Sequence, residues 1–126
     1  MMDENRMSKY IKLGNFAFGE VETVYEEDGD LCGFKTSVIG ANVLGVKAMT
    51  NGYHGGDGGH GCHSYIELED YGGTEMMVST ESDDPEAKVR VDLFGDSELS
   101  TLIAALRFMA DALETSAEYA ESKKNF

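Results

Sequence analysis

The sequence is poor in basic residues, and this shortage excludes several kinds of partner. Ten lysines and arginines stand against 24 aspartates and glutamates, which gives a formal net charge of −14. A surface with this charge repels phosphate groups and anionic lipid over roughly a Debye length, about 8 Å in physiological salt. We therefore expect no direct binding to nucleic acid and no binding to membranes.

Long apolar runs and an apolar leader are also missing. No segment approaches the roughly 18 consecutive apolar residues of a membrane-spanning helix, and the stretch MMDENRMSKY at the start is polar. We expect neither a membrane span nor a signal peptide, and we place the protein in the cytoplasm. In that compartment the two cysteines, Cys32 and Cys62, are expected to stay reduced and to serve in packing or as metal ligands.

A chain of 126 residues has the size of one domain with one hydrophobic core. Its first two thirds contain short apolar stretches separated by turn residues, and its last third has a helical period. The fold class predicted for residues 1–126 is therefore α+β, with an antiparallel multi-stranded sheet covered on one face by a C-terminal amphipathic helix. A glycine- and histidine-rich loop is expected at residues 51–63.

Turn residues and alternation place the strands. Asp28-Gly29 predicts a two-residue hairpin turn, and Gly14-Asn15 predicts a turn or bulge. Further strands are expected in the ranges 21–25, 43–49, 64–69, 74–80 and 88–93. In the third of these, Ser64, Ile66 and Leu68 form an apolar face, whereas the face of Tyr65, Glu67 and Glu69 is expected to be solvated.

The C-terminal third predicts one amphipathic helix. Apolar residues recur at intervals of three and four, namely Leu99, Leu102, Ile103, Leu106, Met109, Ala110, Leu113 and Ala117. Asp96 is the expected N-cap, because its carboxylate can accept a backbone N–H of the first turn. Glu98 suits the positive end of the helix dipole, and Lys123 and Lys124 suit the negative end.

Chemistry-bearing side chains concentrate in the segment TNGYHGGDGGHGCHSY. It contains all three histidines of the chain, spaced by three residues with Asp57, and a cysteine. Imidazole, thiolate and carboxylate groups are zinc ligands, and glycines allow a backbone to fold back so that several ligands meet. The sequence therefore predicts a zinc site, most simply a closed structural one, with ligands from His54, Asp57, His60, Cys62 and His63, and with Cys32, Glu67 or Asp70 as additional candidates.

Three other interpretations of this segment stay open. It could be an exposed loop with solvated histidines, or a nest of backbone N–H groups that binds an anion. The absence of a Walker lysine and of a helix directly after the glycines argues against a nucleotide cradle. In an enzyme, the metal would activate water with Asp57 or Glu67 as the base, but no complete catalytic motif is present, so we expect a protein that is not an enzyme.

Acidic residues form two patches, one near the first hairpin and one in the range 81–86. Such patches are often only solvated. They can also bind a basic protein surface, such as the nucleic-acid groove of an enzyme, with electrostatic steering of association. The candidate partner-binding residues are Glu26, Glu27, Asp28, Asp83 and Asp84.

One resemblance links the loop to the helix. The stretch TNGYHGGDGGHG, the strand Tyr-Ile-Glu-Leu-Glu-Asp and the helix start GDSELSTLIAALRFM together resemble small proteins of phages and prophages, over about the last 80 residues. The recurrent GGD-x-GHG element of that group corresponds here to Asp57, His60 and the glycines around them. His54, Cys62 and His63 are particular to this chain.

Small acidic phage proteins resemble anti-defence factors, above all anti-CRISPR proteins, which commonly block an RNA-guided nuclease by binding it. The resemblance implies a non-catalytic inhibitor that acts in the host bacterial cytoplasm. Its partner would be a bacterial immune nuclease, most simply of type II, because such nucleases have basic channels for guide and target. The alternative is a metal-dependent hydrolase or a binder of a nucleotide signal. The sequence does not decide the oligomeric state.

Overall fold

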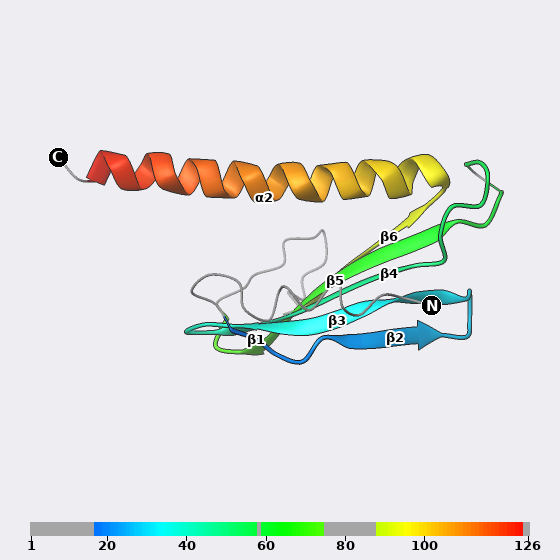
Figure 1. Ribbon diagram of the computed structural model, residues 1–126, viewed down its shortest axis with the longest axis horizontal. Helices are drawn as coiled ribbons and strands as arrows, with labels where there is room; N and C mark the ends of the chain where they lie inside the picture. Colours follow the sequence, from blue (N-terminus) through cyan, green and yellow to red (C-terminus); the bar gives the residue numbers. More distant parts are fainter. Residues whose placement is uncertain (1–16, 58, 75–87, 125–126) are drawn as a thin grey trace, which may run out of the picture.

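The computed structural model describes residues 17–57, 59–74 and 88–124. They form an α+β fold, as the sequence predicts, with an antiparallel sheet and one long helix (Figure 1). The elements are β1 (Ala17–Phe18), β2 (Glu22–Glu26), β3 (Leu31–Ile39), β4 (Val43–Thr50), β5 (His63–Gly72), β6 (Lys88–Phe94) and α2 (Asp96–Lys124). Within these residues no helix is long and apolar enough to cross a membrane. The expected turn at Gly14-Asn15 and nearly all of the strand expected at 74–80 lie outside the described residues.

From β2 to β6 the sheet is a meander in which chain neighbours pair, and β1 pairs with β3. Its order is β1-β3-β4-β5-β6, and β2 pairs with β3 beside β1. The hairpin between β2 and β3 is where the sequence predicts it, but its loop has four residues because Glu26 pairs with Leu31. The prediction of a two-residue turn was wrong: Gly29 and Asp30 both take positive φ, and the Asp30 N–H donates to the Glu27 carbonyl over 3.2 Å.

The small core lies on the face that the sequence predicts to be solvated. Tyr65 has an exposed fraction of 0% and packs with Leu31 and Met49, which are also buried, and with the partly buried Val24. The Arg90 guanidinium lies 3.6 Å from the centre of the Tyr65 ring, and the Tyr65 hydroxyl donates to a carboxylate oxygen of Glu26. The prediction was wrong for Tyr65 because charged groups of the neighbouring strands, the Lys47 ammonium and the Arg90 guanidinium, lie over its ring.

Glycine at position 33 is required by the close approach of β3 and β4 at this core. The register places Val24, Gly33, Met49 and Tyr65 in one row across four strands. A Cβ atom on Gly33 would overlap the carbonyl oxygen of Ala48 and would lie 2.9 Å from the Met49 Cα. Backbone atoms of a central strand cannot move aside cheaply, so this position excludes every larger residue.

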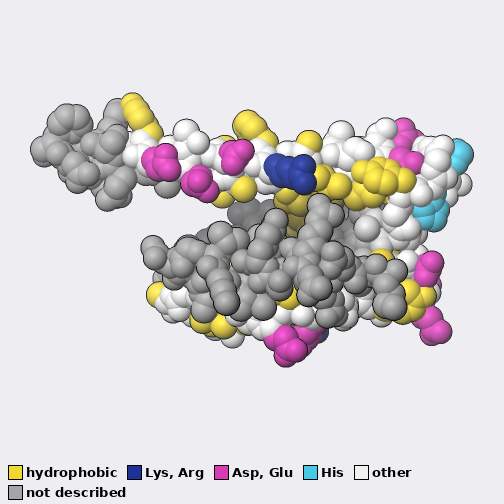
Figure 2. All heavy atoms as spheres, in the orientation of Figure 1, with side chains coloured by type: hydrophobic (Ala, Val, Ile, Leu, Met, Phe, Trp, Pro, Cys, Tyr) yellow, Lys and Arg dark blue, Asp and Glu magenta, His cyan; other side chains and the backbone are white. Residues whose placement is uncertain are grey.

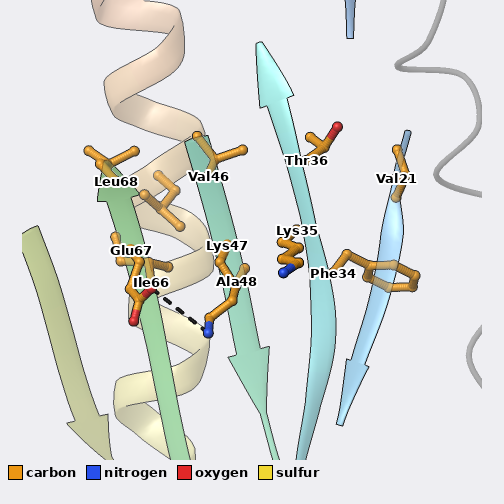
Figure 3. A pocket seen from close by; sticks show the side chains of 11 residues that line it. Val21, Phe34, Lys35, Thr36, Val46, Lys47, Ala48, Ile66, Glu67 and Leu68 are labelled. Carbon is orange, nitrogen blue, oxygen red and sulfur yellow. Dashed lines mark ion pairs between the residues drawn. The ribbon is translucent and has the colours of Figure 1, made fainter. Parts of the chain in front are cut away.

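The opposite face of the sheet is apolar and faces α2. It carries Phe34 from β3, Val46 from β4, and Ile66 and Leu68 from β5, all of which line a cavity of about 280 Å³ together with Leu106 of the helix (Figure 3). The helix begins in contact with β6, and its first apolar residue, Leu99, is buried. Farther along, α2 is exposed, and in Figure 1 its C-terminal turns extend past the labelled strands.

We expect Gly33→Ala to destabilise the fold by about 3 kcal/mol, because overpacking against backbone forces the strands apart. Gly72→Ala is the matched control, since Gly72 is also in a strand and no described atom lies within 4 Å of the place that its added Cβ would occupy. Urea denaturation of both variants measures the difference. Equal stability of the two would contradict the tight contact between β3 and β4.

Candidate functional site

The glycine- and histidine-rich loop, residues 51–62, connects β4 to β5 and lies beside the first turn of α2 (Figure 1). Figure 2 shows histidine side chains at this end of the molecule, next to acidic ones. Among the described residues of the loop, four glycines have positive φ, at positions 52, 55, 59 and 61. Side chains other than glycine rarely adopt this conformation, so the loop's path depends on its composition.

Asn51 holds the two ends of the loop together. Its side-chain N–H groups donate to the carbonyls of Gly61 (2.9 Å) and Gly29 (3.1 Å), and its side-chain oxygen accepts from the His63 N–H over 2.9 Å. The Asn51 N–H also donates to the His63 carbonyl over 3.1 Å. One amide thus joins the loop base to the tip of the β2–β3 hairpin.

Two aspartates exchange hydrogen bonds between the loop and the helix. Asp57, in the loop, accepts from the Ser97 N–H over 2.8 Å and from the Ser97 hydroxyl over 2.9 Å. Asp96, in the helix, accepts from the N–H groups of His54 and Gly55, each over 2.8 Å. Each element therefore satisfies free backbone donors of the other.

The prediction that Asp96 caps its own helix was wrong. Gly95 occupies the cap position, because its carbonyl accepts the first helical bond from Leu99 over 3.1 Å. The carboxylate at the helix N-terminus comes instead from Asp57, 40 residues earlier in the chain. A carboxylate at this place compensates free N–H groups and the positive end of the helix dipole.

The hydrogen bonds lower the pKa values of both aspartates. The Ser97 backbone and hydroxyl donors hold the pKa of Asp57 below its ordinary value. The N–H of His54, followed by those of the next glycines, holds the pKa of Asp96 down in the same way. Both groups are therefore carboxylates throughout the neutral range.

The histidines of the loop point to different partners. The two ring nitrogens of His54 lie 3.0 Å from the His60 carbonyl and 3.2 Å from the Asn51 carbonyl. The ring of His60 packs on Gly56, where an added Cβ would lie 2.7 Å from its Nε2 atom. His63 leaves the loop: its Nε2 atom lies 2.7 Å from Asp92, and its ring stacks on Phe94 with centroids 4.5 Å apart.

Cys62 is buried, with an exposed fraction of 2%. Burial raises the pKa of its thiol, and the nearby Asp96 carboxylate acts in the same direction. A thiol of this kind is mostly protonated at neutral pH, which makes it a poor nucleophile and requires a proton to leave before a metal can bind.

The five predicted ligands are close along the chain but do not converge on one point. Within the described ranges, no three histidine, cysteine or acidic side chains are placed to hold one metal ion. The additional candidates have other partners: Glu67 lies among basic side chains, and Asp70 accepts the N–H groups of Gly72 and Thr74. Zinc binding stays a prediction, and it would require His54 and Asp57 to exchange their present partners.

The anion-nest interpretation meets a similar obstacle. The N–H groups that a phosphate would use at the loop and helix start are those of His54, Gly55 and Ser97. They already donate to the carboxylates of Asp96 and Asp57, whose negative charges repel a phosphate. The arrangement fits a structural junction better than an anion cradle.

The predicted partner-binding residues divide into three groups. Glu27 and Asp28 are exposed at the hairpin tip, and no described ion pair includes them. Glu26 is half-buried, accepts from Tyr65 and lies 3.7 Å from the Lys47 ammonium. Asp83 and Asp84 lie outside the described residues.

Basic side chains of the sheet gather on the face of Tyr65 and are paired there. Glu67, with a side-chain exposure of 11%, lies 3.6 to 3.8 Å from Lys47, Lys88 and Arg90. Lys35 pairs with Glu22 over 3.3 Å on the same face. This face is close to neutral, so the excess negative charge of the described residues lies elsewhere, at the hairpin tip and along α2.

Comparisons of the chain with protein-family models, with curated proteins and with solved structures found no match. The site is therefore interpreted from its own geometry.

Sequence reasoning missed the roles of Asn51, Asp96 and Ser97. The dipeptide Asn51-Gly52 indicates a turn, but it does not predict that the amide will join three segments. The pairing of Asp57 with Ser97 spans 40 residues and has no signal in a single sequence. A Ser at the second helical position next to an acidic residue was the only local hint.

Acid should weaken the junction between the loop and α2. The folded-state pKa of Asp57 lies below its unfolded value, so its contribution is complete above about pH 4 and is lost as the pH falls through the folded pKa. We expect Asp57→Asn to melt below the unmodified protein at pH 7, and the difference in melting temperature to shrink as the pH falls below about 4. Asp111→Asn, on the exposed helix surface, is the control, and its melting temperature should follow that of the unmodified protein at every pH. A difference in melting temperature between Asp57→Asn and the unmodified protein that does not change with pH would contradict the capping role.

The zinc prediction is tested by metal content and by melting before and after chelation. A bound structural zinc gives about one ion per chain and a lower melting temperature after chelation, because metal binding is coupled to folding. His60→Ala should remove the ion, whereas Asn51→Ala should disturb the loop without removing a ligand. Metal-free protein whose melting is unaffected by zinc or chelator would contradict the site.

Proposed function

We propose that this protein is a non-catalytic binding protein that docks on a basic surface of a bacterial RNA-guided immune nuclease, most simply of type II, and blocks its binding of nucleic acid. The observation that carries the proposal is the segregation of charge. The basic side chains of the sheet are paired on one face, whereas the exposed acidic residues Glu27 and Asp28 of the hairpin tip and Asp111, Glu114 and Glu118 of α2 form no ion pair with the other described residues.

Segregated charge acts on association more than on stability. Exposed carboxylates without partners contribute little to the fold, but together they create a negative potential that attracts a basic groove and accelerates encounter. Guide and target channels of RNA-guided nucleases are basic along their length. An acidic protein seated there would compete directly with the phosphate backbone.

The resemblance of the GGD-x-GHG segment to phage proteins supports the choice of partner. The junction between loop and helix gives Asp57 a structural role that needs no catalysis, since both of its oxygens accept hydrogen bonds from Ser97. The loop is accordingly assigned a structural role in the proposal, whether or not it also binds zinc.

The first test is binding to a guide-loaded type II nuclease at low and high salt, together with inhibition of DNA cleavage. We expect affinity to fall at least ten-fold from about 50 to 500 mM salt, because charge complementarity is screened. Asp28→Asn, which removes one negative charge from the hairpin tip, should bind several-fold more weakly. Ala41→Lys is the control: it changes the net charge by the same one unit, but in the turn at the other end of β3, a strand of nine residues, about 30 Å away along an extended strand and beyond the screening length.

Two results would contradict the proposal. Absence of binding to the nuclease at every salt concentration would remove this partner. Equal losses from the hairpin variant and from Ala41→Lys would show that only net charge matters and that the hairpin tip does not dock.

A further inference from the structure

The strand β6 forms one edge of the sheet. It is the last strand in the order and pairs with β5, and no other described strand pairs with its outer side. The helix α2 starts at the end of β6 (Figure 1) and leads away from this edge, because Leu106 already lines the cavity with Val46 and Ile66 of β4 and β5. A strand edge with free backbone groups is a template for a further strand.

The hydrogen-bond pattern of β6 decides which of its residues face this edge. The Gly95 N–H donates to the Cys62 carbonyl over 2.9 Å, in continuation of the register between β5 and β6. Antiparallel strands alternate between hydrogen-bonded and non-hydrogen-bonded pairs. The backbone N–H and carbonyl of Val91 therefore point to β5, whereas those of Arg90 and Asp92 point to the free edge.

The charges of β6 favour one register for pairing with a second copy of itself. In a two-fold symmetric antiparallel pair, residues that point to the free edge face one another, so the symmetry axis passes through a residue of the strand. An axis through Arg90 places two arginines opposite each other, and an axis through Asp92 does the same with two aspartates. An axis through Val91 places each Arg90 opposite the Asp92 of the other copy. Opposite charges at such positions stabilise a strand pair, and like charges destabilise it.

The same register also brings the apolar residues of β6 together. Val91 faces Val91 of the second copy, and Val89 faces Leu93, on the face of the sheet that carries Ile66 and Leu68. Val91 is 42% exposed in the single chain. Side chains at non-hydrogen-bonded positions approach each other closely, so the second copy would cover this valine.

The strand β2, on the other side of the sheet, does not have this self-complementary pattern. Its charged residues are Glu22 and Glu26, both acidic, so pairing with a second β2 brings only like charges together. Charges of one sign are a common protection of edge strands. The hairpin tip that follows β2 stays free when copies pair through β6.

We propose that this protein forms a two-fold symmetric dimer in which the β6 strands of two copies pair antiparallel about Val91 and continue the sheet. Arg90, which is bound to Asp92 of its own chain over 3.0 Å, then lies between two aspartates, one from each copy. The net charge of −14 on each copy opposes association, but salt screens this repulsion beyond about 8 Å. Dimerisation should therefore be stronger in physiological salt than in low salt, opposite to the salt dependence expected for the nuclease.

The test compares Arg90→Asp, Asp92→Arg and an equal mixture of the two by sedimentation velocity in physiological salt. In each variant alone both interchain pairs become like-charged, so we expect the dissociation constant to rise at least about ten-fold. In the mixture both pairs are again of opposite charge, so a heterodimer should form. Asp111→Arg, on the exposed surface of α2, is the control. It changes the net charge as Asp92→Arg does and should leave dimerisation intact.

Circular dichroism checks the folding of the variants, because Arg90 also lies over the Tyr65 ring. A second measurement needs no variant: amide exchange at Arg90 and Asp92 of the unmodified protein should slow as its concentration rises. A monomer at every concentration would overturn the inference. It would also be overturned by a dimer that both folded variants keep, by folded variants that do not associate when mixed, or by amide exchange at these two positions that does not change on dimerisation. None of these results bears on the proposed function.

Discussion

The reciprocal capping of loop and helix is the contact on which the arrangement of this protein depends. Asp57 of the loop accepts from Ser97 of the helix, and Asp96 of the helix accepts from His54 and Gly55 of the loop. Without these bonds the first turn of α2 and the glycine-rich backbone would both expose free donors. The direction in which α2 leaves the sheet is fixed here, because farther along the helix is largely exposed.

This junction explains the presence of glycines and of Asp57 in the loop without a ligand. Gly56 admits the His60 ring, and positive φ at Gly55 belongs to the backbone that presents its N–H to Asp96. In this chain, Gly55 and Asp57 of the GGD-x-GHG element thus belong to a loop that caps a distant helix. A zinc ion, where it binds, would have to compete with the hydrogen bonds of His54 and Asp57.

The sequence predicts those features that depend on local periodicity. The α+β class, β4, β5 and β6, and the C-terminal helix follow from alternation at period two and from the stripe at period 3.6. Prediction fails where a residue's role depends on a distant segment. Tyr65 is in an alternating strand and is predicted to be solvated, but Arg90 from β6 and Glu26 from β2 enclose it. Asp96 has the composition of an N-cap, but the cap is supplied from the loop.

The two faces of the sheet carry different kinds of side chain. Four basic residues of β3, β4 and β6 cluster on the Tyr65 face, where they pair with Glu22, Glu67 and Asp92, and two of them, Lys47 and Arg90, lie over the Tyr65 ring. The opposite face carries apolar residues, among them Val46, Ile66 and Leu68, and faces α2. The sheet thus separates its charged from its apolar side chains, because successive side chains of a strand point to opposite faces.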